Sequence, residues 1–507
     1  MGGVYTYVRY ELGRIATAPS NNETPPGGLV GSGTVPGKVA DQADGLKPEN
    51  ILLIGNETRQ GLTPYEQQLF GSSIIYSGTL ADIIMVLHLD PAKDTASILS
   101  IPRDVFVPMP AGSPVGAYQK VDAALNDGAD GPNNLIAAIQ DDFGIAINHF
   151  VELNFNGLIN VINAIGGINV YFPDPVYDAD SLLYIPTSGC HHLNGFYSLT
   201  LVRARHLQYD PPGDNEPRED WPYDPESDLA RILRTHTFLK IVADKVRKEG
   251  LADPLSAPGF LSAIVTDVRM DQGLKNELLS LVIHYRHVNL NTAPETTLPT
   301  SSVNGDYYFD DNEIGDVLFP VEPNDLDTIR AWDSSSLPTP VAPQAVSVVS
   351  IAGSAVDATS AGQALSSDGL HVTSATAGDV PSSTTETYVV YHKGQVAEAL
   401  DVMKYLSGSV VMQLGPSVPA GTVQVQLGSV YQVTSKKVAP APTTATTSPA
   451  SSTSSTTTAP TSTSSTTKSV AHMHVAAPTT TVPTPDGNPA SSASGAEEPW
   501  DPRACPS

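Results

Sequence analysis

Two apolar runs, DIIMVLHLD at residues 82–90 and TASILSIPRD at residues 95–104, decide the fold of this chain. Both have the length of a strand and are bounded by Asp or Pro. A third run of the same kind, ILLIG, occupies residues 51–55. Short apolar runs between turn residues are typical of buried strands. The sequence therefore predicts a sheet at the centre of the fold.

Helices are expected to follow these strands. The segments NLIAAIQDDFG (134–144) and FNGLINVINAIGG (155–167) both end at glycine, which commonly stops a helix, and the strand-like INVYF (168–172) comes next. Alternation of strands and helices favours an α/β or mixed α+β sandwich.

The clearest helix is ESDLARILRTHTFLKIVADKVRKEG at residues 226–250, with Ser227 or Asp228 as its N-cap. Arg231 and Arg234 fall on the side opposite its apolar stripe, so we expect the two guanidinium groups to face one ligand together. The stripe consists of Leu229, Ile232, Leu233, Leu239, Ala243 and Val246.

The rest of the chain falls into segments of different composition. Residues 18–47 are rich in Gly, Pro, Asn and Thr, and we interpret them and residues 336–345 as linkers. Residues 346–433 alternate between strand and helix patterns, which predicts a small second α/β module. Residues 434–507 are mostly Ser, Thr, Pro and Ala, which cannot bury a core, so a disordered or glycosylated tail is expected.

Charge and the remaining sequence signals limit the classes of function. The chain has 54 Asp and Glu against 27 Lys and Arg, a net charge of −27, which argues against a nucleic-acid partner. No run approaches the 18 apolar residues of a membrane helix, and the opening MGGVYTYVRYELGRI lacks the apolar core of a signal peptide. The two cysteines, Cys190 and Cys505, fit either one disulfide in an oxidising compartment or two unrelated thiols.

Arginine is scarce in this acidic chain, yet LVRARHLQYD (201–210) carries Arg203 and Arg205 one residue apart. Such a pair taken alone is usually a solvated edge. Its motif context is more specific. From residue 48 to residue 240 the chain contains, in order, ILLIGNETRQG, GTLADIIMV, SIPRD, KVDAAL, INHFVELNFNG, VINAIGGINVYF, GCHHLNG, LVRARH and DLARILRTHTF.

This order of motifs resembles the LytR-CpsA-Psr family of bacterial cell-wall glycopolymer ligases, and residues 346–433 resemble the LytR C-terminal domain. The resemblance implies a ligase domain over residues 48–335, an α-β-α sandwich around a central mixed sheet with an apolar pocket for a polyprenyl chain. It implies a magnesium-dependent phosphotransferase that moves glycan-1-phosphate from a polyprenyl diphosphate to a peptidoglycan hydroxyl. It also implies an extracytoplasmic protein anchored by a membrane helix upstream of residue 1, with residues 1–47 as juxtamembrane segment and linker.

By position, the resemblance assigns catalysis to Asp82 and Arg103, and Mg²⁺ to Glu57 and Asp82. A diphosphate suits arginine, whose planar guanidinium binds two oxygens at once. The expected ligand-binding residues are Arg59, Arg103, Arg203, Arg205, Arg231, Arg234 and Lys120, although Lys120 also fits a surface lysine.

Five positions depart from the family pattern. Glu57 replaces an aspartate, Leu80 replaces an arginine and Ile83 replaces a hydroxyl residue, while Ala230 and Thr235 stand where glycine and glutamine are usual. A second hypothesis is therefore a degenerate paralogue that binds polyprenyl diphosphate lipids without efficient transfer. A third is a wall-spanning surface protein in which the Ser/Thr-rich tail matters most.

Overall fold

The computed structural model of the chain describes residues 16–18, 47–70, 79–126, 130–211, 213, 217–225, 228–250, 268–285, 288, 293–302, 307–309, 312–351, 355–380, 385–429, 432–433 and 498–506. The predicted N-terminal linker and Ser227 fall almost wholly outside these residues, as does the tail up to residue 497. The described residues belong to one compact unit.

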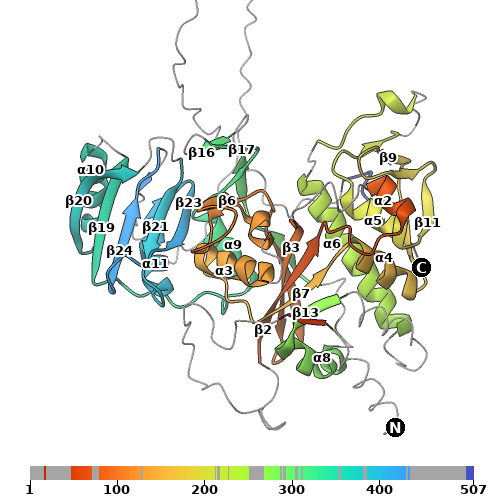
Figure 1. The fold of residues 1–507 in the computed structure, drawn as a ribbon, viewed down its shortest axis with the longest axis horizontal. Helices are drawn as coiled ribbons and strands as arrows, with labels where there is room; N and C mark the ends of the chain where they lie inside the picture. Colours follow the sequence, from red (N-terminus) through yellow and green to blue (C-terminus); the bar gives the residue numbers. More distant parts are fainter. Residues whose placement is uncertain are drawn as a thin grey trace, which may run out of the picture. The chain divides into compact units, whose positions relative to one another are not determined.

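A mixed sheet forms the centre of the main domain, by which we mean residues 47–335 (Figure 1). The run at 82–90 becomes a central strand, antiparallel to both neighbours. The short turn at residues 91–94 joins it to the next strand, as antiparallel pairing allows. In spatial order the strands are β1 (Ala16–Ala18), β13 (Val268–Asp271), β7 (His149–Leu153), β2 (Glu49–Asn56), β3 (Ala81–Asp90), β4 (Thr95–Ser100) and β14 (Glu295–Thr297).

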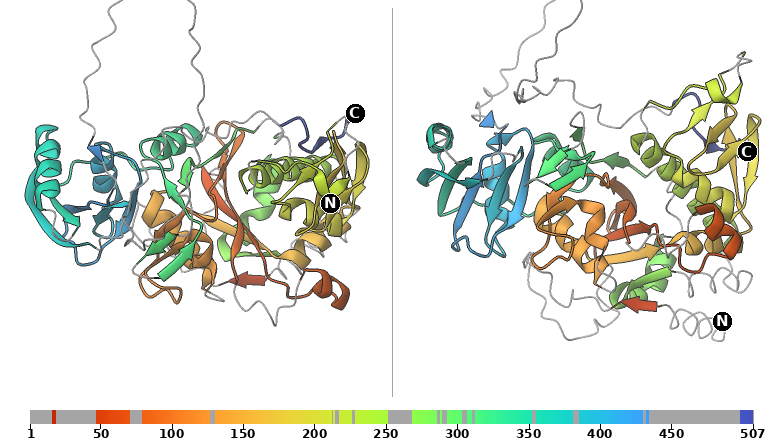
Figure 2. Two further views of the ribbon diagram at one scale, coloured as in Figure 1. Left: turned by 90° about the horizontal axis from the view of Figure 1, so that it is seen from above. Right: turned by 45° about the horizontal axis from the view of Figure 1, so that its top comes forward.

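Helices cover both faces of this sheet, which confirms the predicted sandwich (Figure 2). Helix α3 (Gly131–Phe143) and helix α9 (Asn324–Trp332) pack on one face, while α8 (Gln272–Tyr285) packs on the other. Helix α3 ends as predicted at Gly144, whose φ of 71° lies in the left-handed region that favours glycine. Each fully buried aliphatic side chain in this core contributes about 1.5–3 kcal/mol.

A second apolar core lies beside the sheet and positions the site. It is built from helix α4 (Phe155–Ala164), helix α5 (Gly195–Arg203) and part of helix α6 (Asp228–Lys245). The N-caps of α4 and α5 are Asn154 and Asn194, whose side chains each accept a backbone hydrogen bond from the first turn. Two short sheets complete this region: β10 (Leu183–Ile185), β9 (Val176–Asp178) and β12 (Gln208–Tyr209); and β11 (Gly189–Leu193), β8 (Ile168–Phe172) and β26 (Arg503–Ala504).

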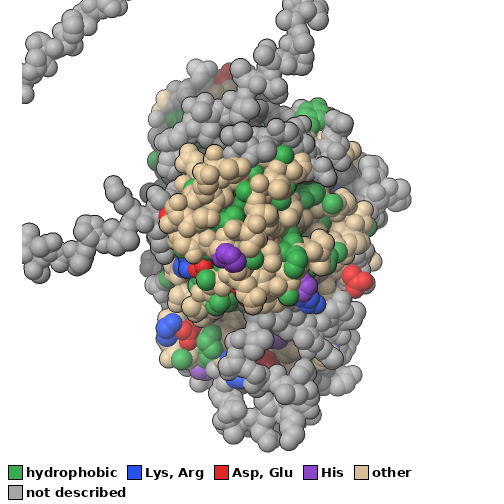
Figure 3. Space-filling view, turned by 90° about the vertical axis from the view of Figure 1, so that its left-hand side faces the viewer, with side chains coloured by type: hydrophobic (Ala, Val, Ile, Leu, Met, Phe, Trp, Pro, Cys, Tyr) green, Lys and Arg blue, Asp and Glu red, His purple; other side chains and the backbone are tan. Residues whose placement is uncertain are grey.

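The C-terminal module, residues 345–433, is the predicted α/β unit. The five strands of its larger sheet run in the order β20 (Val372–Val380), β19 (Ala345–Ile351), β24 (Thr422–Gln426), β21 (Thr387–Tyr391) and β23 (Val410–Leu414), with helices α10 (Ala355–Ser367) and α11 (Val396–Met403). The face in Figure 3 carries few charged side chains, although the whole chain is strongly acidic.

The module is not separated from the main domain by a free linker. One hydrophobic cluster contains Phe143 of α3, Leu337 of the predicted linker, and Met412 of the module. Tyr391 of the module donates a hydrogen bond of 3.0 Å to the carbonyl of Asp141. The apolar residues around the predicted linker therefore join the two parts.

The end of the chain differs from the prediction of a disordered tail. Residues 498–506 lie against the main domain: β26 pairs antiparallel with β8, and Cys505 forms a disulfide with Cys190 of β11. This settles the pairing of the two cysteines. The Ser/Thr/Pro-rich composition of residues 434–497 gave no sign that the residues after them, 498–506, have contacts of their own.

No helix among the described residues is long and apolar enough to cross a membrane.

Candidate active site

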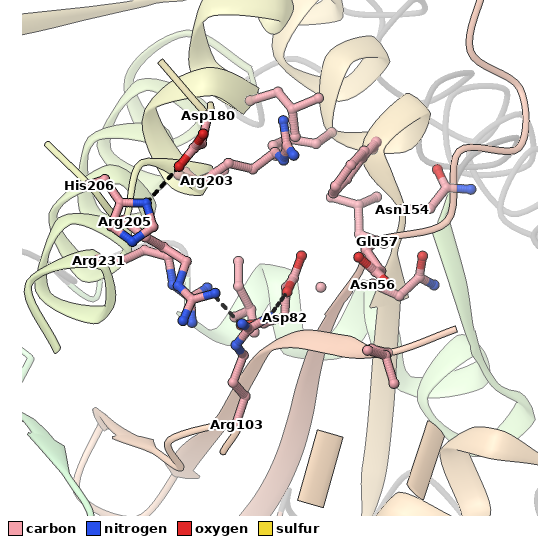
Figure 4. Close-up of a pocket in the computed structure, with 18 residues that line it drawn as sticks. Asn56, Glu57, Asp82, Arg103, Asn154, Asp180, Arg203, Arg205, His206 and Arg231 are labelled. Atoms are coloured by element: carbon pink, nitrogen blue, oxygen red, sulfur yellow. Dashed lines mark hydrogen bonds and ion pairs between the residues drawn. The ribbon is translucent and has the colours of Figure 1, made fainter. Parts of the chain in front are cut away.

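The antiparallel pairing of β2 and β3 brings two acidic motifs to one edge of the sheet. Asn56 pairs with Ala81, so Glu57, which follows β2, and Asp82, at the start of β3, meet there. A cavity of about 420 Å³ opens at this edge, walled by α4, α5 and the first turn of α6 (Figure 4). Its polar lining is Asn56, Glu57, Asp82, Arg103, Asn154, Asp180, Arg203, Arg205, His206 and Arg231.

Asp82 is held by two arginines from different elements. Arg103, after β4, donates from Nη1 to Asp82 Oδ1, and Arg231 of α6 donates to the backbone carbonyl of Asp82 at 2.7 Å. Burial disfavours the charge of Arg103, but the surrounding carboxylates, Asp82 first among them and then Asp104, together outweigh burial and raise the pKa of Arg103. Asp82 Oδ2 has no hydrogen-bond partner within the described part of the chain, so it is available to a ligand.

Asp228, the first residue of α6, orients two further arginines. Its carboxylate accepts hydrogen bonds of 3.0 and 3.1 Å from Arg231, and Oδ1 lies 2.9 Å from Arg205 Nε. Burial would raise the pKa of Asp228, but Arg231 and Arg205 outweigh it and lower that pKa. An ionised Asp228 therefore fixes both guanidinium groups at the cavity wall.

Arg203 is the least compensated cation in the cavity. Its guanidinium carbon lies 4.9 Å from the ring centroid of Phe155 and 5.0 Å from that of Phe70, and buried Nη1 has no hydrogen-bond partner among the described residues. Burial lowers the pKa of Arg203. A buried charge with an unused donor is costly. An anionic ligand bound here would offset that cost.

Glu57 completes the acidic side of the cavity. Its backbone N–H donates to the carbonyl of Leu80 at 3.3 Å. Glu57 and Leu80, two of the positions that depart from the family pattern, therefore lie side by side. Burial, and secondarily the charge of Asp82, raises the pKa of Glu57. A second carboxylate that disfavours the charge of Glu57 suits a cation bound between the two. Mg²⁺ commonly takes one or two carboxylates together with phosphate oxygens, so Glu57 and Asp82 fit this ion.

One other acidic cluster lies at the opposite end of β2. The side-chain ligand atoms of Glu49, His149 and Glu277 all lie within 4.8 Å of one another, but these residues do not line the cavity. His149 also pairs with Asp271 through Nδ1 at 2.9 Å. This contact links β7 to the end of β13.

Six of the predicted site residues line the cavity, and three do not. Arg59 is buried and donates to the carbonyls of Phe70 (2.8 Å) and Glu57 (3.1 Å), so it supports the loop after β2. Lys120 lies 3.2 Å from Asp104, whose other oxygen is 3.4 Å from Arg103 Nε. Lys120 therefore interacts with Arg103 through Asp104 and does not line the cavity.

The expectation that Arg231 and Arg234 face one ligand together is wrong. Both are buried, but Arg234 donates to Asp224 at 2.6 Å and to the carbonyl of Ala204 at 2.9 Å, away from the cavity lining. Residues three apart on a helix differ by about 60° in direction. The acceptors beside each arginine decided where it points.

Asp180 and His206 also line the cavity and were not predicted. His206 Nδ1 lies 2.7 Å from Asp180 Oδ2 (Figure 4). The His206 backbone N–H donates to Asp178 at 2.8 Å. Because a carboxylate accepts, Nδ1 donates and Nε2 is left as an acceptor. His206 follows Arg205 directly in the motif, which was the available signal. Asp180 lies in a turn with no comparable signal.

Comparisons with known proteins agree with the motif order. The chain is 33% identical over 235 residues to a probable cell wall biosynthesis protein, LcpB, of Corynebacterium glutamicum, covering 46% of this chain and 51% of that protein. It is 36% identical over 129 residues to the polyisoprenyl-teichoic acid–peptidoglycan teichoic acid transferase TagV of Bacillus subtilis, covering 25% and 32%. The chain thus spans about half the length of the first relative, and less of the second.

Solved structures of similar proteins include a LytR-Csp2A-Psr enzyme from Actinomyces oris. It has 21% identity and a TM-score of 0.41, and the match covers 56% of this chain and 89% of that one. The sequence profile of the LytR_cpsA_psr family matches residues 32–317, more than half of the chain. The chain therefore belongs to the LytR_cpsA_psr family.

Proposed function

We propose that this protein is a phosphotransferase that moves glycan-1-phosphate from a polyprenyl diphosphate to a hydroxyl of peptidoglycan. The observation that carries the proposal is the buried Nη1 of the half-buried Arg203, which has no hydrogen-bond partner among the described residues and belongs to a side chain that shares one cavity with Asp82 and Glu57. A diphosphate would supply its missing acceptors. Relatives named as teichoic acid–peptidoglycan transferases support the same class of reaction.

The cavity divides into a polar and an apolar side. Arg103, Arg203, Arg205 and Arg231 would bind the diphosphate oxygens, and charge neutralisation is the main contribution a protein makes to phosphoryl transfer. Leu153, Phe155, Leu158, Leu199 and Val202 line the other wall and would contact the first isoprene units.

Glu57 and Asp82 would hold Mg²⁺, which supplies further charge neutralisation on the phosphate oxygens when bound. Arg103 orients Asp82 for this role through its hydrogen bond to Oδ1. Because Glu57 has a raised pKa, its affinity for a cation should fall as the pH drops.

The acceptor hydroxyl must lose a proton as its oxygen attacks the glycan-linked phosphorus and the bond to polyprenyl phosphate breaks. His206 would take this proton on Nε2, since Asp180 holds Nδ1 as the donor. Polyprenyl phosphate then leaves, and the glycan phosphate remains on the acceptor.

We also propose that the protein acts outside the cytoplasm. The disulfide between Cys190 and Cys505 supports an oxidising compartment.

The test is release of polyprenyl phosphate from a polyprenyl-diphosphate glycan in the presence of Mg²⁺ and peptidoglycan acceptor. Asp82→Ala should abolish release, whereas Asp327→Ala, at an exposed ion pair with Arg330, should leave it unchanged. EDTA should stop the wild-type reaction. Release that persists in Asp82→Ala would refute the proposed centre.

Glu57 and Leu80 favour a second candidate, a paralogue that binds polyprenyl diphosphates without efficient transfer. Under that alternative, the wild-type protein would bind the lipid but release no polyprenyl phosphate. The same assay, run with a direct measurement of lipid binding, separates the two functions.

A further inference from the structure

The last described residues of the chain contact Arg234, which is hydrogen-bonded to the backbone between the cavity residues Arg203 and Arg205. We call residues 498–506 the C-terminal strap. The strap is held by the β26–β8 pairing, by the disulfide, and by Trp500, whose ring stacks on Tyr209 with centroids 4.0 Å apart and planes 7° from parallel. Its place in the fold is therefore fixed at several points along its length.

Asp501 of the strap faces Arg234. The Asp501 side chain is buried, and its Oδ1 lies 3.6 Å from Arg234 Nη1. Its Oδ2 accepts a hydrogen bond of 3.1 Å from the backbone N–H of Glu498, which ties the carboxylate to the turn of the strap. Arg234 is 2% exposed, so the charge of Asp501 has little access to water and depends on this guanidinium.

Arg234 in turn holds the backbone between the two cavity arginines. It donates at 2.9 Å to the carbonyl of Ala204, the C-cap of α5 and the residue between Arg203 and Arg205. Asp224 holds the same guanidinium at 2.6 Å. The two carboxylates thus set where Arg234 lies, and Arg234 sets where the backbone of residues 203–205 turns.

We propose that Asp501 is a positioning residue that aligns Arg203 and Arg205 for the diphosphate. It acts through Arg234 and the carbonyl of Ala204 and touches no substrate. This inference rests on the proposed function for the ligand, while the mechanical link from strap to arginines stands on the contacts alone. The end of the chain, more than 260 residues after Arg234, is then part of the scaffold of the site.

A positioning role for Asp501 can be distinguished by experiment from a role in stability alone. Loss of Asp501 leaves Arg234 with Asp224, so the protein should remain folded while the 203–205 backbone gains freedom. A displacement of about 1 Å at such groups is enough to weaken ligand binding strongly. Binding of the anionic end of the ligand should suffer more than overall stability.

The experiment compares the full-length wild type with Asp501→Asn, Asp501→Glu and the control Asp327→Asn. Asp327 pairs with Arg330 at 3.5 Å, a similar Asp–Arg distance, but at the surface and away from the cavity. The probe is geranylgeranyl diphosphate with Mg²⁺, and its dissociation constant is measured by calorimetry. Hydrogen exchange of the peptide 199–209 and thermal unfolding are followed in the same proteins.

We expect Asp501→Asn to weaken binding of the probe about five- to twentyfold and to speed exchange in residues 199–209. Asp501→Glu should recover part of both, and Asp327→Asn should change neither. The proposal is overturned if exchange at 199–209 is unchanged in Asp501→Asn, or if the loss of affinity is matched by a global loss of stability. A wild type that does not bind the diphosphate would refute the proposed function, while the exchange data would still decide the link to the strap.

Discussion

The cavity and the contact between the main domain and the C-terminal module both bury acidic side chains, but under different conditions. In the cavity, Asp82 and Asp228 each contact arginine. In the contact region, which we call the seam, the buried acids form no ion pair with Lys or Arg among the described residues. These acids are Asp142, Glu322, Asp325 and Glu386.

The pKa values follow this difference. Arginine lowers the pKa of Asp228 in spite of burial, so it stays charged. At the seam, burial raises the pKa of Glu386 to about 8, while Tyr388 and Tyr307 donate to its Oε2 at 3.2 and 3.4 Å. The acid that contacts arginine is therefore held in its charged form, whereas burial without an arginine partner favours the neutral form of Glu386.

The largest expected effect is in the cavity. Arg203→Ala should lower transfer about 100- to 1,000-fold, because an anionic ligand loses a desolvated, charge-assisted donor. Folding stability should change little, since Arg203 has no ion pair to lose among the described residues. The measurement is release of polyprenyl phosphate alongside thermal unfolding. The control is Arg218→Ala, because the Arg218 guanidinium stacks on Tyr177 and does not line the cavity. An equal loss of transfer in this control would contradict a specific role for Arg203.

At the seam, Glu386→Gln should stabilise the protein at pH 8 by on the order of 2–3 kcal/mol. A carboxyl with a folded pKa of about 8 and an ordinary value of 4.5 binds its proton more tightly when folded. Its stabilising contribution is therefore complete below pH 4.5 and is lost as the pH rises toward 8. Glutamine removes this loss, so the gain should be much smaller at pH 5.

Denaturant unfolding at pH 5 and pH 8 checks the seam prediction. Glu313→Gln, on the exposed face of β17 (Asn312–Gly315), is the control and should shift neither value. A gain of equal size at both pH values would mean that the titration of Glu386 is not its cause.

His206→Gln should lower transfer about tenfold, a smaller effect than for Arg203 because its pair with Asp180 is exposed to solvent. Lipid binding should be unaffected, since glutamine adds no charge and the arginines remain. The measurement is the rate of polyprenyl phosphate release at saturating lipid and acceptor. An unchanged rate in the variant would exclude His206 as the proton acceptor.

Glu57→Asp should have the smallest effect, a few-fold change in the Mg²⁺ concentration that gives half-maximal release. Aspartate keeps the charge and shortens the reach by about one bond length, and phosphate oxygens and water can make up the difference. Titration of activity with Mg²⁺ gives the result. Complete loss of the Mg²⁺ response would show that the site is built for the longer side chain.

The candidate site was partly predictable because its motifs are local. Asp82 and Arg103 adjoin strands that their own apolar pattern defines, and Arg203, Arg205 and Arg231 stand in motifs that resemble those of the family. Arg234 was not predictable in the same way. Its motif position matches that of Arg231, but its buried partners come from Asp224, Ala204 and Asp501.

By itself the sequence determined the central-sheet strands at residues 51–55, 82–90 and 95–100, the helices that end at glycine, and the clustering of cations in an acidic chain. Apolar periodicity and helix stops act over a few residues, so they can be read from neighbours in the chain. Only the tertiary structure decided which arginines face the cavity, that Cys505 reaches Cys190, and that Asp501 lies behind the site. A buried charge is oriented by whichever acceptors surround it, and here these come from segments hundreds of residues apart.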